Sequence, residues 1–179
     1  MNDPSHRQSL VLVGYRGTGK STVGRILAER LGLPFADADV ELEALVGRPI
    51  PAIFAEEGEA AFRDWEERIL CDLSTRPRTI VATGGGVVLR EANRKLMKSF
   101  GFVAWLTADP EVLAGRLRAD PEGLAGRPSL TGAGTLGEIA RVLEARTPLY
   151  RAVADAIVDT GRRTPAQTAD AILDRWPHA

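Results

Sequence analysis

Gly14-Tyr15-Arg16-Gly17-Thr18-Gly19-Lys20-Ser21 has the spacing G-x-x-x-x-G-K-[ST] of a phosphate-binding loop, and it decides the fold. The apolar run at residues 10–13 predicts a strand before the loop, and apolar residues at helical spacing predict a helix after it, ending at Gly32. Glycines let successive backbone N–H groups close around phosphate oxygens, and the helix start adds a positive dipole end. The stretch therefore predicts a nucleotide site. A chance glycine-rich turn would explain neither the strand nor the helix.

The motif also assigns roles to individual side chains. We expect Lys20 to reach the β- and γ-phosphates of a nucleotide, as both a binding and a catalytic residue, and the Ser21 hydroxyl to ligate Mg²⁺. The predicted nucleotide contacts of the loop are Gly17, Thr18, Gly19, Lys20, Ser21 and Thr22.

The composition is that of one compact domain. The chain has 179 residues, 44% of them hydrophobic, which predicts a single domain over 1–179 with its core over about 9–176. A net charge of −1 argues against nucleic acid or an anionic membrane as a partner. No apolar run approaches the roughly 20 residues of a membrane span, and residues 1–8 are too polar for a signal peptide. We therefore expect a cytoplasmic monomer that binds small molecules.

Two residue types that often carry chemistry are scarce. Cys71 is the only cysteine, so it forms no intrachain disulfide, and we expect a buried thiol in a reducing compartment. His6 and His178 lie near the chain ends, where we do not expect acid–base chemistry. Catalysis therefore has to use other groups.

Strands and helices alternate along the chain. Apolar and β-branched runs predict strands over 10–13, 33–39, 79–83, 102–106 and 156–159. Helical spacing predicts helices over 22–31, 40–46, 50–57, 59–74, 91–98, 110–117, 135–153 and 165–173. This alternation predicts an α/β fold with a five-stranded parallel sheet covered on both faces. Ligands then bind at the carboxyl edge of the sheet, where the phosphate loop, Asp37, Asp39 and residues 84–86 fall.

Taken together, the motifs resemble those of the shikimate kinase family over nearly the whole chain. G-x-x-G-x-G-K-S-T, D-x-D, G-E-x-x-F-R-x-x-E, G-G-G, R-P and R-x-P-L-Y occur in the family's order, at residues 14–22, 37–39, 58–66, 84–86, 127–128 and 146–150. The phosphate loop alone would indicate only a superfamily. The resemblance implies a three-layer fold like that of the nucleoside monophosphate kinases, with substrate binding by about residues 37–66. It also implies that MgATP phosphorylates the 3-hydroxyl of shikimate.

Asp37 and Asp39 form the predicted acid pair. On an extended backbone we expect the two carboxylates to project differently, one toward Mg²⁺ and the other toward an acceptor hydroxyl. The resemblance makes Asp37 the metal-side acid and Asp39 the residue that orients the attacking hydroxyl and accepts its proton. An N-cap at Asp39 is the alternative, and it is compatible with the catalytic role.

Arg63 lies one helical turn from both Glu59 and Glu66, so it could belong to a plain surface ion-pair ladder. The resemblance instead implies that Glu66 holds the guanidinium while Arg63 grips a substrate carboxylate, with Arg146 as a second carboxylate-binding arginine. It also implies substrate contacts from Phe54, Phe62 and the Gly84-Gly85-Gly86 turn. Phe62 could equally be a core residue, Arg146 ordinary surface charge, and the triplet a plain tight turn.

The segment over about 118–134 is rich in Asp, Pro, Gly and Ser, and loops this long are usually functional or disordered, so we predict a mobile lid. Its Arg127 would enter the site on closure and neutralise charge on the transferring phosphoryl group, unless it is a solvated loop arginine. Arg127-Pro128-Ser129-Leu130 departs from the family's R-P-L-L. For adenine, the resemblance implies an arginine before the lid, Arg116 or Arg118, together with Arg163 and Pro165.

Other functions remain open at this point. Gluconate kinase shares the implied fold and an acidic polyol substrate, although the G-E-x-x-F-R stretch favours shikimate. A nucleotide-dependent switch would normally carry N-K-x-D for guanine, and the chain has no such tetrapeptide. A degenerate binding domain is disfavoured because Lys20, Ser21, Asp37, Asp39 and Arg63 are all retained.

Overall fold

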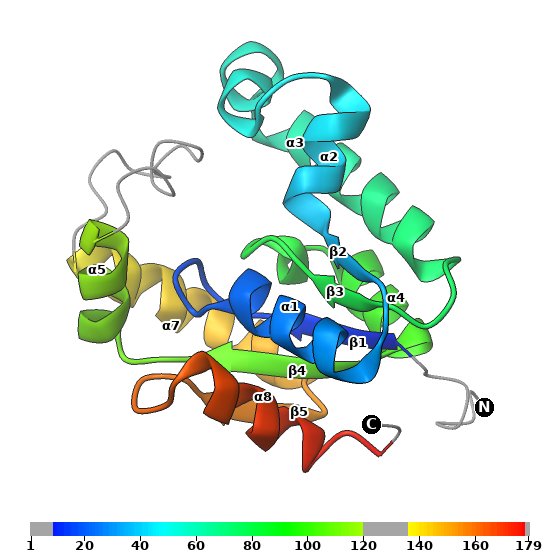
Figure 1. The fold of residues 1–179 in the computed structure, drawn as a ribbon. Helices are drawn as coiled ribbons and strands as arrows, with labels where there is room; N and C mark the ends of the chain where they lie inside the picture. Colours follow the sequence, from blue (N-terminus) through cyan, green and yellow to red (C-terminus); the bar gives the residue numbers. More distant parts are fainter. Residues whose placement is uncertain (1–8, 120–135, 178–179) are drawn as a thin grey trace.

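A computed structural model describes residues 9–119 and 136–177 and contains the predicted five-stranded parallel sheet (Figure 1). The strand order is β2-β3-β1-β4-β5, and every neighbouring pair is parallel. The strands are β1 (Ser9–Val13), β2 (Phe35–Asp37), β3 (Ile80–Ala82), β4 (Gly101–Thr107) and β5 (Ala156–Asp159).

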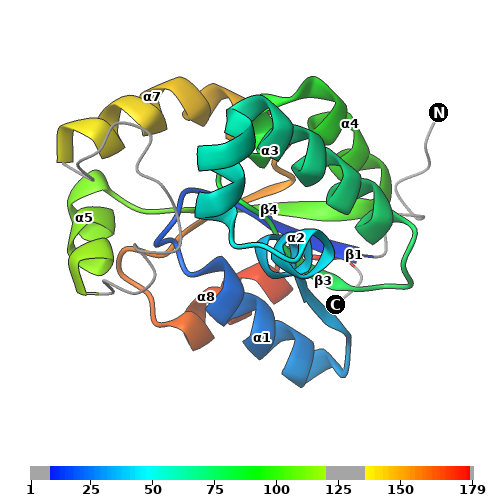
Figure 2. The ribbon, with the colours of Figure 1, turned by 90° about the horizontal axis from the view of Figure 1, so that it is seen from above.

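The sheet is the middle of three layers, as Figure 2 shows. Side chains of β1 alternate between the two faces and are fully buried on both. Leu10 and Leu12 pack against α1 (Lys20–Leu31) and α8 (Pro165–Leu173). Val11 and Val13 belong to the core on the opposite face, which is covered by α3 (Ile50–Ser74), α4 (Glu91–Phe100) and α7 (Leu136–Val153). The continuous apolar run is therefore that of a central parallel strand.

The remaining elements surround the carboxyl edge of the sheet. Helix α2 (Ala38–Val46) follows β2 directly and packs on α3. Helix α5 (Pro110–Ala119) and α7 share a small core with Tyr15 of the phosphate loop. A 3₁₀ turn, η2 (Val87–Leu89), follows the glycine triplet. Helix α8 begins after the N-cap Thr164, whose hydroxyl accepts from the Gln167 backbone N–H in a full capping box.

Of three local predictions, the structure contradicts two and confirms one. The strand predicted to run to residue 39 ends at Asp37, and Asp39 lies in the first turn of α2. Cys71 is exposed, because its neighbours Leu70 and Leu73 take the inward face of α3. The predicted break at Gly58 is confirmed as a kink within α3, where φ is 82° and ψ is 176°.

Part of the predicted lid falls on ordered helix, since residues 118 and 119 are the last of α5. Its other residues, with Arg127, lie outside the described ranges, as do His6, His178 and the predicted helix start at Thr135. Within the described ranges, no helix is both long and apolar enough to cross a membrane.

Candidate active site

The phosphate loop joins β1 to α1 in a backbone path that needs glycine. Gly14, Gly17 and Gly19 all have positive φ, at 146°, 81° and 88°. At Gly14 a side chain would also collide with the sheet, because its Cβ would lie 2.3 Å from the carbonyl oxygen of Leu106. The glycines of the motif therefore serve both the loop's conformation and its close approach to β4.

Polar side chains of this loop turn inward. Lys20 is buried, and its ammonium donates to the carbonyl oxygens of Gly14 at 2.8 Å and Tyr15 at 3.0 Å. The Ser21 hydroxyl donates to Oδ2 of Asp37 at 2.5 Å. The structure thus brings the predicted metal pair, Ser21 and Asp37, together at the start of α1 and the end of β2.

A cavity of about 490 Å³, including space open to solvent, lies beside the loop. Most of the predicted nucleotide contacts line it: Gly17, Thr18, Gly19, Thr22, Arg116, Arg163 and Pro165. Arg116 donates to the Gly17 carbonyl at 3.1 Å and to the Thr160 carbonyl at 2.7 Å, whereas Arg118 donates back to Ala114 of its own helix. Of the two arginines left open by the sequence, Arg116 is the one at this cavity.

A second cavity, of about 620 Å³ including space open to solvent, lies on the other side of the loop. The full lining is Tyr15, Arg16, Asp39, Ile50, Phe54, Phe62, Arg63, Glu66, Gly84, Gly85, Gly86, Glu138 and Arg146. Every residue predicted to bind substrate is among them. We call this the acceptor cavity, and the one lined by Arg116 and Arg163 the nucleotide cavity.

Arg63 is buried in the wall of the acceptor cavity rather than exposed in a surface ladder. Its Nη1 donates to Glu66 at 2.8 Å and its Nη2 to Glu59 at 3.1 Å. Burial raises the pKa of the Glu66 carboxyl, and the adjacent Arg63 guanidinium opposes that rise. Arg63 also lies so close to Gly86 that a Cβ there would be 2.3 Å from Nη1. The alternative that Arg63 belongs to an exposed ion-pair ladder on the helix surface is therefore wrong.

Two carboxylates meet at the start of the glycine triplet. A Cβ on Gly84 would lie 2.8 Å from Oδ1 of Asp39 and 3.0 Å from Oε1 of Glu66. Asp39 is held there by the first turn of α2, where Asp37 is the N-cap and accepts from the Asp39 backbone N–H at 3.1 Å. The cap predicted as an alternative for Asp39 is thus Asp37, and the Asp39 side chain lines the cavity.

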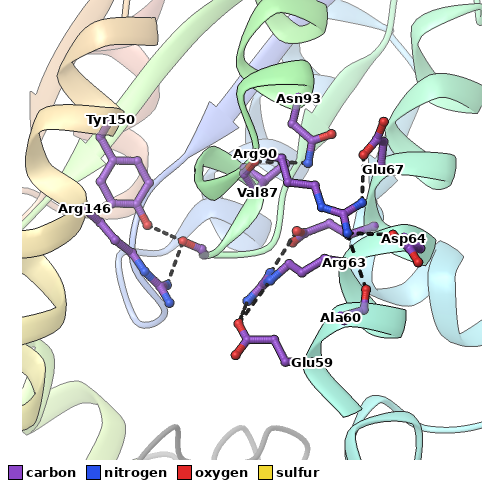
Figure 3. Close-up of polar contacts among 12 residues, drawn as sticks. Glu59, Ala60, Arg63, Asp64, Glu67, Val87, Arg90, Asn93, Arg146 and Tyr150 are labelled. Carbon is purple, nitrogen blue, oxygen red and sulfur yellow. Dashed lines mark hydrogen bonds and ion pairs between the residues drawn. The ribbon is translucent and has the colours of Figure 1, made fainter. Parts of the chain in front are cut away.

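Side chains of α7 and α3 hold the glycine triplet and the turn that follows it, as Figure 3 shows. From α7, Arg146 Nη1 and the Tyr150 hydroxyl both donate to the Gly85 carbonyl, at 3.0 and 2.5 Å. From the end of η2, Arg90 donates to Asp64 at 2.6 Å and to Glu67 at 2.8 Å on α3. The glycine triplet, predicted to contact substrate with a plain tight turn as the alternative, is therefore held by α7 and lines the acceptor cavity.

Four lining residues were not predicted from the sequence: Tyr15, Arg16, Ile50 and Glu138. Tyr15 and Arg16 occupy variable positions of the phosphate-loop motif, where the pattern carries no side-chain information. Glu138 lies about two helical turns before Arg146 on α7, and that spacing is the signal that could have placed it near the site.

The comparisons with known proteins agree with this geometry. A family model described as shikimate kinase matches residues 16–177. A shikimate kinase from Rhodopirellula baltica is 44% identical over 98% of this chain and 94% of its own length. The chain belongs to the shikimate kinase family.

Other members of the shikimate kinase family also match most of the chain. A shikimate kinase from Cupriavidus pinatubonensis is 47% identical over 93% of this chain and 85% of its own. Among solved structures, shikimate kinase from Acinetobacter baumannii in complex with shikimate is 38% identical, with a TM-score of 0.87 over 93% of this chain and 91% of that one.

Proposed function

We propose that this protein transfers the γ-phosphate of ATP to the 3-hydroxyl of shikimate, giving shikimate 3-phosphate and ADP, in the biosynthesis of aromatic amino acids. Family membership supports the reaction. The observation that carries it is the acceptor cavity, where Arg63, Arg146 and Asp39 line one space beside the phosphate loop. A carboxylated ring alcohol needs cations for its carboxylate and a proton-accepting carboxylate for its hydroxyl, and this cavity holds both.

On the donor side, the phosphate loop binds the triphosphate. Backbone N–H groups and the start of α1 receive the phosphate oxygens, and Lys20 neutralises the β- and γ-phosphates. Arg116, Arg163 and Pro165 contact the base from the nucleotide cavity that they line. In this proposal the terminal phosphate faces the acceptor cavity.

Mg²⁺ fits the oxygen atoms at the start of α1. Ser21 Oγ and Asp37 Oδ2 lie 2.5 Å apart, and Mg²⁺ in phosphoryl-transfer sites usually takes one or two protein oxygens together with substrate phosphates. The ion would neutralise charge on the β- and γ-phosphates. Ser21 and Asp37 are the residues that would hold it.

Asp39 orients the acceptor hydroxyl and accepts its proton. It lies in the first turn of α2, and its side chain lines the acceptor cavity. Phosphoryl transfer depends mainly on positioning and charge stabilisation. Asp39→Asn should therefore keep the fold and lower turnover by roughly 10²-fold or more. Unchanged turnover would remove Asp39 from the mechanism.

In the acceptor cavity, Arg63 and Arg146 bind the substrate carboxylate. Arg63 is pre-oriented by Glu59 and Glu66, so its planar fork is fixed before substrate arrives. Phe54 and Phe62, whose ring centroids are 4.6 Å apart, supply an apolar wall for the carbocyclic ring. Gly84, Gly85 and Gly86 present backbone to its hydroxyls.

The segment over about 118–134 is proposed to act as a lid that carries Arg127. Arg127 would neutralise the transferring phosphoryl group on closure. We further propose a cytoplasmic monomer, because ATP is abundant in the cytoplasm and one chain supplies both cavities. Light scattering of the purified protein tests the monomer.

The deciding experiment is ADP release with MgATP and shikimate, quinate, gluconate or nucleoside monophosphates as acceptors. We expect shikimate to be strongly preferred, with shikimate 3-phosphate as the product identified by mass spectrometry. Preference for gluconate or a monophosphate would overturn the substrate assignment and leave the kinase fold intact.

A further inference from the structure

Arg16 has no role in the reaction described so far. It occupies a variable position of the phosphate-loop motif, so the motif does not demand an arginine there. Its side chain nonetheless lines the acceptor cavity together with Asp39 and Arg63. Its guanidinium carbon lies 5.9 Å from the centre of the Tyr15 ring, a distance at which a cation and an aromatic face attract.

The three arginines of the acceptor cavity differ in what they bind. Arg63 donates to Glu59 and Glu66, and Arg146 donates to the Gly85 carbonyl. Among the contacts of residues 9–119 and 136–177, Arg16 has neither a carboxylate nor a carbonyl acceptor, and its Nε is covered from solvent without a hydrogen-bond partner. A desolvated donor without an acceptor costs free energy, so an anion at this position would stabilise the site.

The location of Arg16 indicates which anion that is. Its backbone belongs to the loop that holds the phosphates, and its backbone N lies 3.5 Å from where a Cβ on Gly85 would be. Arg16 thus lies where the phosphate loop contacts the glycine triplet, in the lining of the acceptor cavity and next to Gly17, which lines the nucleotide cavity. The group that crosses between these cavities during the reaction is the phosphoryl group.

We propose that Arg16 contacts the transferred phosphoryl group from the acceptor side, and so binds the phosphate monoester of the product as well as the transition state. This rests on the proposed function. In the step, the bond from the acceptor oxygen to the γ-phosphorus forms, the bond from that phosphorus to the β–γ bridging oxygen breaks, and the hydroxyl proton goes to Asp39. Arg16 stays protonated and donates to the equatorial oxygens, over which the negative charge is spread.

The test compares Arg16→Met, which keeps an apolar stem over Tyr15, with Arg16→Lys, which keeps the charge and loses the planar fork. Arg25→Met is the matched control, because Arg25 also lies over an aromatic ring, at 4.9 Å from the Phe35 centroid, and lines neither cavity. The readouts are kcat, the two KM values, calorimetric affinities for shikimate and shikimate 3-phosphate, and thermal unfolding with MgADP to verify folding.

We expect Arg16→Met to lower kcat roughly 10- to 100-fold and to weaken shikimate 3-phosphate binding about tenfold, while shikimate affinity changes less than about threefold. Arg16→Lys should fall between it and the wild type, and Arg25→Met should match the wild type. If Arg16→Met does not fold, the test uses Arg16→Lys, in which the affinity for shikimate 3-phosphate should fall more than the affinity for shikimate.

Two outcomes would overturn the proposal. If Arg16→Met lost affinity for shikimate at unchanged kcat, Arg16 would bind the substrate and not the phosphoryl group. If only the thermal stability changed, Arg16 would serve only to pack against the Tyr15 ring. Failure of the proposed function is a separate result, because it appears in the wild type as a preference for another acceptor. The same ratios would then be measured with that acceptor and its phosphate ester.

Discussion

Gly86 lacks a side chain where Arg63 fills the space. A Cβ on Gly86 would lie 2.3 Å from Nη1 and 2.5 Å from Nη2 of Arg63, and the Gly86 backbone, at φ −99° and ψ −1°, is open to any residue. Because Glu59 and Glu66 tether the guanidinium, it cannot move aside without losing hydrogen bonds. We predict that Gly86→Ala keeps the fold and raises the KM for shikimate about tenfold, with little change in the KM for ATP. Steady-state kinetics with each substrate varied measure this.

Gly115→Ala on α5 is the matched control for this substitution. A Cβ on Gly115 meets nothing within 4 Å, so both KM values should stay at the wild-type level. Helix stability should rise by about 0.5–1 kcal/mol. An unchanged shikimate KM in Gly86→Ala would mean that Arg63 does not need its observed position to bind the acceptor.

The buried Tyr150 hydroxyl should make the stability of the protein depend on pH. Burial raises the pKa of its hydroxyl to about 12 from 10.0, because the anion would lose its hydration. The unfolded chain therefore releases this proton first, so the stability that the neutral hydroxyl supplies is complete below pH 10.0 and is lost as the pH rises to about 12. We predict that the unfolding free energy of wild type relative to Tyr150→Phe falls over this window by roughly 2–3 kcal/mol. Urea unfolding across the window tests it, and a constant difference would contradict it.

At the scale of elements, the kink in α3 shapes the acceptor cavity. Gly58 has φ 82° and ψ 176°, a region essentially restricted to glycine, and it separates the helical turns that carry Phe54 and Phe62. We predict that Gly58→Ala lowers the unfolding free energy by about 1–3 kcal/mol and weakens shikimate binding, because the two rings can no longer meet. Urea unfolding and calorimetry measure the two effects. Gly115→Ala again serves as the control, and a Gly58→Ala variant with wild-type stability would argue against strain at the kink.

At the scale of the whole molecule, the sequence predicted the features that depend on local pattern. The strand at residues 10–13 and the glycine spacing after it predict the sheet and its ligand-binding edge, because period and turn chemistry are local. The N-cap at Asp37 and the exposure of Cys71 depend on where a strand ends and which helix face is covered. Arg16 and Glu138 line one cavity only because α7 packs beside the phosphate loop, a long-range contact with no local signal.

Because the two cavities flank one loop of one sheet, each ligand should stabilise the whole fold. At 100 times its Kd, shikimate should add about 2.7 kcal/mol to the unfolding free energy, which raises Tm by roughly 5–10 °C for a domain of this size. Arg63→Met removes the cation that Glu59 and Glu66 orient, so it should abolish the shikimate shift and keep the shift given by MgADP. Scanning calorimetry of both proteins with each ligand provides the comparison. Loss of both shifts would show that Arg63 supports the entire carboxyl edge of the sheet, whereas retention of the shikimate shift would remove Arg63 from the carboxylate site.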